Sequence, residues 1–117
     1  MSYSTTGNPV AGASLQEYAH LGSAPIITGE LAGSATAVQM PTRAAYLVKF
    51  KAAPDNAGKV YIGVAGVTKA DGTTDTTTGY VLSAGEESGL LPCNNLNEFY
   101  RISDNAGDDL VYIAWAR

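Results

Sequence analysis

The side chains that could act as nucleophile and base in this 117-residue chain are few and far apart. Cys93 is the only cysteine and His20 the only histidine, and a catalytic thiol needs a base within hydrogen-bond reach. The two could meet only if the N-terminal part of the chain folded back onto the strand that contains Cys93. Because Cys93 follows Pro92 in a short apolar run, we expect a buried, unreactive thiol.

Acid–base chemistry with two carboxylates is the next option. Glycosidases hold two carboxyl groups about 5–9 Å apart across a cleft. Here the carboxylates occur as neighbours, in Glu86-Glu87 and Asp108-Asp109. Adjacent residues on a turn point in different directions, so we expect them only to solvate loops. The sequence therefore predicts a protein that is not an enzyme, with no catalytic residue and no cofactor.

Calcium binding is the remaining chemical option. Asp71 and Asp75, with threonine oxygens between them, offer hard ligands in a polar loop, and a second set comprises Asp104, Asp108 and Asp109. Neither set has the EF-hand spacing or its terminal glutamate, so we interpret both as Asp-containing turns and assign no metal ligand. Whether the loop of residues 69–78 binds calcium or a glycan stays open.

A four-residue repeat organises the rest of the chain. Asp55-Asn56-Ala57-Gly58 recurs as Asp104-Asn105-Ala106-Gly107, and each copy lies between runs rich in Val, Ile, Tyr and Phe. Asp and Gly suit the first and fourth positions of a type I turn, where Gly accepts a positive φ. We therefore predict two β-hairpins, with four turn-forming residues: Asp55, Gly58, Asp104 and Gly107.

Alternation of apolar and polar residues identifies the strands. In residues 45–51, Tyr46, Val48 and Phe50 share one side, which is typical of a half-buried strand. Similar short runs follow, and no long helix is indicated. About seven short strands joined by turns predict an all-β fold, an antiparallel β-sandwich or barrel of jelly-roll-like form.

The N-terminal third differs in composition from the rest. Residues 1–34 are rich in Ser, Thr, Gly and Ala, and we interpret them as an extended N-terminal arm before a β-sandwich domain of residues 35–117. The arm is nevertheless too apolar for a simple linker. We expect it to bind a neighbouring subunit through five residues: Leu15, Tyr18, Leu21, Ile26 and Ile27.

Composition excludes several classes of partner. The seven basic residues are dispersed and the net charge is −4, which argues against nucleic-acid binding. No apolar run approaches the ~20 residues of a membrane span. A single cysteine permits no internal disulfide and fits folding in a reducing cytoplasm. Only 15% of residues are charged, below the usual ~25%, which favours broad contacts in a homo-oligomer.

A family resemblance adds to this interpretation. From Val48 to Trp115 the chain resembles small β modules in structural proteins of tailed bacteriophages, including capsid decoration proteins and head or tail fibre subunits. The resemblance rests on turn and strand residues, namely Val60-Tyr61-Ile62-Gly63-Val64, Gly79-Tyr80, Gly85-Glu86, Leu91-Pro92, Asn95-Leu96-Asn97, Asp104-x-Ala106-Gly107 and Val111-Tyr112-Ile113-Ala114-Trp115. The N-terminal arm and the Thr-rich residues 73–78 lie outside the family pattern.

The resemblance implies a role in the virion. It implies a decoration or cement protein, made in the bacterial cytoplasm, that binds the major capsid protein lattice on the outer capsid surface and stabilises the head. A trimer would suit local three-fold positions on such a lattice. The alternative is a fibre or tail-associated module that binds host-surface glycans, motivated by the strand tyrosines and the loop of residues 69–78.

Overall fold

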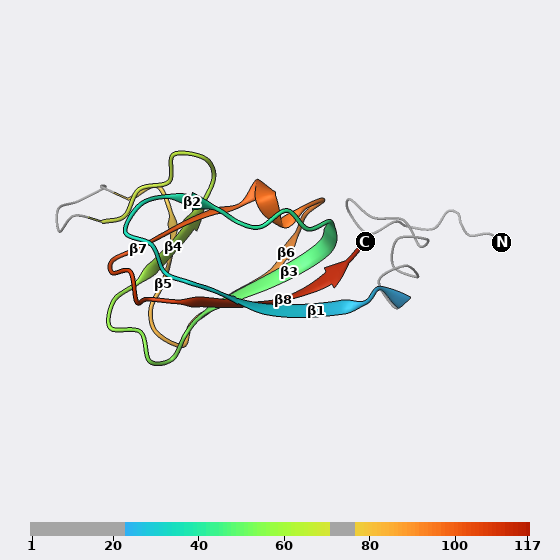
Figure 1. The fold of residues 1–117 in the computed structure, drawn as a ribbon, viewed down its shortest axis with the longest axis horizontal. Helices are drawn as coiled ribbons and strands as arrows, with labels where there is room; N and C mark the ends of the chain where they lie inside the picture. Colours follow the sequence, from blue (N-terminus) through green and yellow to red (C-terminus); the bar gives the residue numbers. More distant parts are fainter. Residues whose placement is uncertain (1–22, 71–76) are drawn as a thin grey trace, which may run out of the picture.

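The computed structural model of the protein describes residues 23–70 and 77–117, and almost all regular structure in this part of the chain is β-strand (Figure 1). One short 3-10 helix, η1 (Leu96–Glu98), precedes the seventh of eight strands. The strands are β1 (Ile26–Leu31), β2 (Val38–Gln39), β3 (Ala45–Ala52), β4 (Val60–Gly63), β5 (Tyr80–Leu82), β6 (Glu87–Pro92), β7 (Tyr100–Ser103) and β8 (Leu110–Ala116). The prediction of an all-β fold is confirmed.

The strands form two antiparallel sheets of four strands each. Sheet A has the order β1-β8-β3-β6 and sheet B the order β2-β7-β4-β5. Each early strand therefore pairs with a late one, β1 with β8, β2 with β7, β3 with β6 and β4 with β5, and these pairs alternate between the sheets. This is the strand order of a jelly roll, in which one long antiparallel ribbon is rolled into a sandwich.

The two repeated turns are not hairpins. The first copy joins β3 in sheet A to β4 in sheet B, and the second joins β7 in sheet B to β8 in sheet A. Each turn is therefore an arch that carries the chain from one sheet to the other. Among the described strands, β4 and β5 are the only consecutive pair that hydrogen-bond to each other. The hairpin prediction was wrong because a strand–turn–strand sequence looks the same locally whether its strands pair or separate.

The β domain begins earlier than the boundary predicted at residue 35. β1 pairs with β8 along its whole length, from Ile26 opposite Trp115 to Leu31 opposite Leu110. Ile27, which the sequence placed in a subunit-binding arm with Ile26, packs against the core of its own domain. The other three predicted arm contacts, Leu15, Tyr18 and Leu21, lie outside the described residues.

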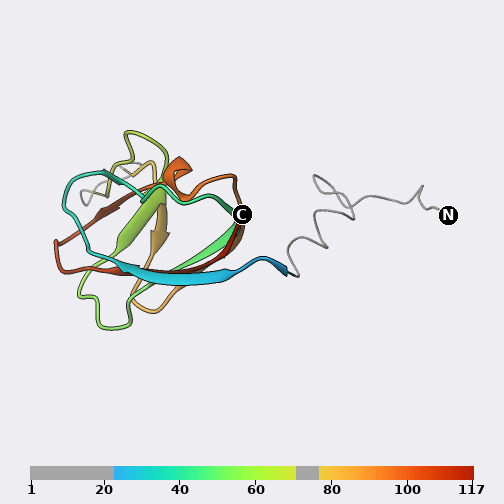
Figure 2. The same cartoon turned by 45° about the vertical axis from the view of Figure 1, so that its right-hand side comes forward.

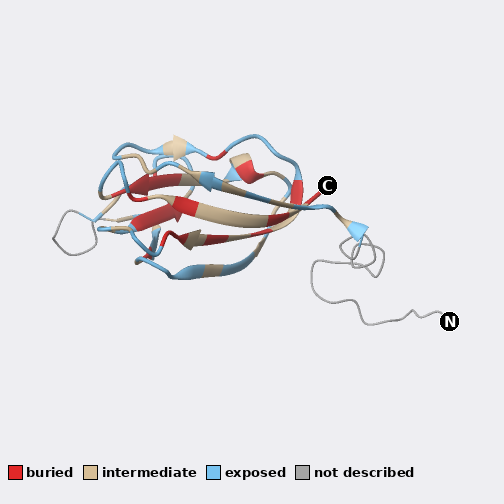
Figure 3. Cartoon of the chain, turned by 60° about the horizontal axis from the view of Figure 1, so that its bottom comes forward, coloured by how far each residue is buried: buried red, intermediate tan, exposed pale blue. Residues whose placement is uncertain are grey.

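The core lies between the sheets, where the inward side chains of alternate positions meet. It is built around large buried residues from several strands and η1, including Val48, Phe50, Leu82, Leu96 and Leu110. The Phe50 and Phe99 rings pack edge to face, with centroids 5.4 Å apart. Figure 3 shows the buried residues concentrated on the strands and the connecting loops mostly exposed.

The outer face of sheet B is covered by the chain itself. Tyr61 and Ile102 point outward from β4 and β7, yet they are only 2% and 8% exposed, because they cluster with Val67 of the β4–β5 connection. A β-carbon at Gly63 would lie 2.7 Å from Val67 Cγ2, so the close contact requires glycine. Within residues 23–70 and 77–117 no helix has the length and apolarity needed to cross a bilayer.

Candidate functional site

The two repeated turns meet at one end of the sandwich. One turn connects β3 to β4 and the other connects β7 to β8. Because β3 pairs with β8 in sheet A and β4 pairs with β7 in sheet B, the two turns cross between the sheets side by side. Between them lies the Asp108 carboxylate, which is 2% exposed. Its Oδ1 accepts hydrogen bonds from the Ala57 and Gly58 N–H groups, both at 3.0 Å. Its Oδ2 accepts from Asn105 N and Nδ2, again at 3.0 Å.

This environment makes Asp108 a structural carboxylate. Burial alone would raise its pKa, but the hydrogen bonds from Gly58, Asn105 and Ala57 outweigh burial, and the pKa lies below its ordinary value. Both oxygens are occupied by N–H donors and not by solvent, so the expectation that Asp108 only solvates a loop was wrong. Among the described residues no three His, Cys, Asp or Glu side chains cluster in a way that could hold a metal ion.

The four turn residues named from the sequence have different roles. Neither Gly58 nor Gly107 has the positive φ expected of it; the described glycines that do are Gly66, Gly85 and Gly89. Gly58 is needed for close approach, since a β-carbon there would lie 2.7 Å from both Asp104 Cβ and Asp108 Oδ2.

Gly107, by contrast, faces open space. The Asp104 carboxylate accepts hydrogen bonds from Lys59 N and the Tyr61 hydroxyl, both at 3.0 Å. Asp55, at the equivalent position of the first copy, is exposed. The four equivalent positions of the repeat therefore do not share one function.

The remaining described candidates for chemistry each have a structural partner. The Cys93 thiol is half-buried and donates to the Ala45 carbonyl at 3.7 Å, and burial and Glu98 raise its pKa despite the opposing effect of Arg117. His20, Asp71 and Asp75 lie outside the described residues. Glu86 accepts a hydrogen bond from Ser83 N at 2.7 Å, whereas Glu87 pairs with Lys49 at 3.1 Å. Both glutamates are therefore engaged with structural partners.

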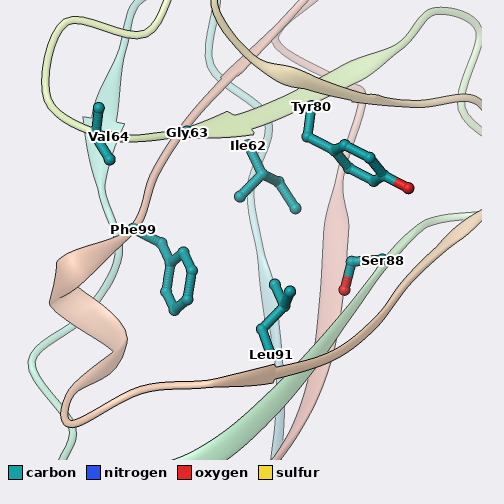
Figure 4. Close-up of a pocket in the computed structure, with 7 residues that line it drawn as sticks. All are labelled: Ile62, Gly63, Val64, Tyr80, Ser88, Leu91 and Phe99. Atoms are coloured by element: carbon teal, nitrogen blue, oxygen red, sulfur yellow. The ribbon is translucent and has the colours of Figure 1, made fainter.

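An apolar groove opens between the two sheets on the side where β5 and β6 form their edges (Figure 4). Its volume is about 390 Å³, and its lining residues are Ile62, Gly63, Val64, Tyr80, Ser88, Leu91 and Phe99. The Ser88 hydroxyl is already engaged, accepting from Phe50 N at 3.0 Å and donating to the Gly89 carbonyl at 2.8 Å. The groove therefore offers shape and apolar contact but little hydrogen-bonding capacity.

Tyr80 is the exposed aromatic residue at this groove, with 62% of its surface accessible. The other strand tyrosines are buried or half-buried: Tyr46, Tyr61, Tyr100 and Tyr112. The Arg117 guanidinium stacks 4.2 Å from the Tyr46 ring, and Tyr112 packs against the core. The described strands therefore present one exposed tyrosine and not a platform of several rings.

Sheet A has a second apolar surface on its outer side. The register of the four strands aligns the outward side chains in rows. The row nearest the ends of β1 and β8 is entirely apolar and comprises Ile26, Trp115, Leu47 and Pro92. The next row runs Thr28, Ile113, Lys49, Leu90, so it adds Ile113 and Leu90 on either side of Lys49. We call the six apolar residues of these two rows, Ile26, Leu47, Leu90, Pro92, Ile113 and Trp115, the outer apolar face.

The outer apolar face is exposed. Ile26 and Leu90 are 59% and 56% accessible, and Leu47, Ile113 and Trp115 are half-buried and absent from the core cluster. The outward side of an antiparallel sheet that faces water is usually polar. Contiguous exposed apolar surface of this kind is typical of interaction sites. Sequence alternation placed Leu47 on the side away from the core, but only the register brings it beside Trp115 and into one row with Ile26.

No protein-family model, curated protein or solved structure matches this chain.

Proposed function

We propose that this protein is a non-enzymatic structural subunit of a bacteriophage virion, and specifically a capsid decoration or cement protein. In this role it binds the major capsid protein lattice from outside and stabilises the head. The observation that carries the proposal is the outer apolar face, which gives a sparsely charged jelly-roll domain a surface suited to burial in an assembly.

Two separate apolar features suit a subunit with more than one kind of neighbour. The outer apolar face lies on sheet A, whereas the groove with Tyr80 lies between the sheet edges at β5 and β6. One surface is available for contact between copies and the other for contact with the lattice. We propose a homo-oligomer on this basis, with a trimer favoured because it matches the local three-fold positions of an icosahedral shell.

Net charge supports the outer side of the capsid as the location. The net charge of the chain is −4, and packaged DNA would repel an acidic protein on the inner side of the capsid. Charge contributes little to the contact with the lattice in this proposal. Attachment therefore depends mainly on apolar contact, and a stable contact buries roughly 1,200 Å² or more in total.

The test is the number and position of copies on purified particles. Quantitative gel analysis and cryo-electron microscopy of particles made with and without this protein would give both. We expect hundreds of copies on the head and lower resistance of the head to heat or osmotic shock when they are absent. A few copies at the tail tip, or none on the particle, would exclude the decoration role.

The second candidate is a fibre or tail-associated module that binds host-surface glycans. Exposed Tyr80 at the rim of the groove favours it, since an accessible aromatic ring can stack on a sugar. The jelly-roll fold does not separate the candidates, because it is used by both capsid and lectin domains. Binding to a glycan array that Tyr80→Ala abolishes and Val81→Ala retains would support this candidate. Absence of binding by the wild-type protein would count against it.

A further inference from the structure

We propose that the apolar groove between β5 and β6 is a binding site for the alkyl chain of a small, uncharged, single-chain amphiphile. The inference goes beyond the proposed function and does not depend on it. It follows from the place where the groove interrupts the core, from the chemistry of the lining residues and from the two strand edges beside the groove.

The groove is a place where the core of the sandwich is incomplete. The two sheets form separate layers, and β5 and β6 belong to different layers (Figure 2). On β5, Tyr80 and Leu82 lie on the same side of the strand, opposite the core residues Ile62 and Val60 of β4. Leu82 is 1% exposed, whereas Tyr80 is 62% exposed. A core-facing position is therefore open to a group from outside.

Core residues form the inner wall of the groove. Ile62 is a buried member of the core cluster, and Leu91 and Phe99 pack against that cluster. Figure 4 shows these three side chains pointing into one space from β4, from β6 and from the residue after η1. Protein interiors leave few voids larger than a water molecule, and ligand pockets have volumes of about 300–1,000 Å³. A groove of about 390 Å³ is therefore large enough for one small ligand.

The lining favours an uncharged group. None of the described residues that line the groove carries a charge, and the Ser88 hydroxyl is already used as donor to the Gly89 carbonyl and as acceptor from Phe50 N. An ionic or strongly hydrogen-bonding group would lose water on entering the groove and find no partner there. An alkyl chain loses no hydrogen bond, and its burial is favourable in proportion to its apolar area. The groove therefore suits the alkyl part of an amphiphile whose polar end stays in solvent.

The strand edges beside the groove disfavour a peptide as the occupant. A peptide has backbone N–H and C=O groups that need partners, and it commonly satisfies them by adding a strand to a free sheet edge. Here β5 has only three residues, Tyr80–Leu82. β6 ends at Pro92, which has no N–H, and its Gly89 carbonyl already accepts from the Ser88 hydroxyl. Both edges are poor templates for strand addition, whereas an alkyl chain needs no such edge.

Titration of the full-length protein with straight-chain primary alcohols, from butanol to octanol, tests the proposal by methyl NMR. We expect saturable shifts of the Ile62, Val64 and Leu91 methyl signals, with a dissociation constant that falls about fourfold for each added CH₂. Leu90 is the matched control within the same protein. It neighbours Leu91 on β6 and is 56% exposed, but it belongs to the outer apolar face on the other side of the sheet, so its signals should shift little.

Two charge substitutions separate the groove from exposed apolar surface in general. Val64→Asp places a carboxylate in the lining at a position that is 71% exposed, so the fold should be retained while octanol binding weakens by about tenfold or more. Leu90→Asp introduces the same charge at an exposed position outside the groove and should bind octanol like the wild type. Circular dichroism checks the fold of both variants.

The inference is overturned if the alcohols cause no saturable shift in the groove, if the Leu90 and Leu91 signals shift equally, or if the two Asp variants weaken binding equally. Loss of particle attachment in Val64→Asp, together with no alcohol binding by the wild type, would also overturn it and would identify the groove as a protein contact. Saturable alcohol binding by a protein that never attaches to particles would support the inference and overturn the proposed function alone.

Discussion

Replacing Asp108 with asparagine should destabilise the protein more than its small change in size implies. The carboxylate accepts four hydrogen bonds at 3.0 Å and is 2% exposed. An asparagine keeps one oxygen for two of these donors and turns an NH₂ group toward the other two. Losing two charge-assisted hydrogen bonds at about 1.5–3 kcal/mol each gives an expected loss of about 3–6 kcal/mol. A domain of this size has a total stability of only about 5–15 kcal/mol.

Urea denaturation followed by circular dichroism measures this loss, and Asp55→Asn is the matched control. Asp55 opens the first copy of the repeat and is exposed, so the same chemical change there should cost no more than about 0.5 kcal/mol. The pH dependence provides a separate check. Because the pKa of Asp108 is lowered in the folded state, its stabilising effect is present above the unfolded pKa of about 3.9 and is lost as the pH falls through the folded value.

The difference in unfolding free energy between wild type and Asp108→Asn should therefore shrink on acidification from pH 7 to pH 3. Below about pH 4 the decrease should approach 1.4 kcal/mol per pH unit until the folded pKa is reached. The reasoning would be refuted if Asp108→Asn and Asp55→Asn cost the same, or if the wild-type advantage did not change with pH. Either result would mean that the hydrogen bonds from the N–H groups of the two arches to this carboxylate contribute little to the free energy of unfolding.

Two further predictions follow from the same structure. Gly58→Ala should cost about 1–3 kcal/mol, because its β-carbon would lie 2.7 Å from Asp104 Cβ, whereas Gly107→Ala at the equivalent repeat position should be nearly neutral; equal melting temperatures would contradict this. Cys93 should react with iodoacetamide at pH 8 at least about tenfold more slowly in the folded protein than in urea, since its thiol is half-buried and its pKa is raised; equal rates would show an accessible thiol.

The sequence by itself determined the fold class and much of the strand layout. Alternation in residues 45–51 correctly separated Val48 and Phe50, which face the core, from Leu47 on the other side. Short β-branched runs and frequent turn residues indicated a jelly-roll-like sandwich. These features depend on local preferences and on a period of two residues, and both can be read from consecutive positions.

The tertiary structure alone decided which strands are partners. A run such as Asp55-Asn56-Ala57-Gly58 reverses the chain equally well in a hairpin or in an arch, so the sequence could not show that both copies cross between sheets. The pairing of β3 with β8 and of β4 with β7 then brought the copies together around Asp108. The pairing of β1 with β8 placed Ile26 in the sheet and not in an arm.

The outer apolar face could not be predicted from the sequence for the same reason. Its members come from β1, β3, β6 and β8, and no strand contributes more than two of them. Ile26, Leu47 and Trp115 become one surface only when register fixes which residues lie opposite one another. Register is set by the whole set of long-range hydrogen bonds and core contacts, because a shift of one residue would turn every side chain to the other face of the sheet.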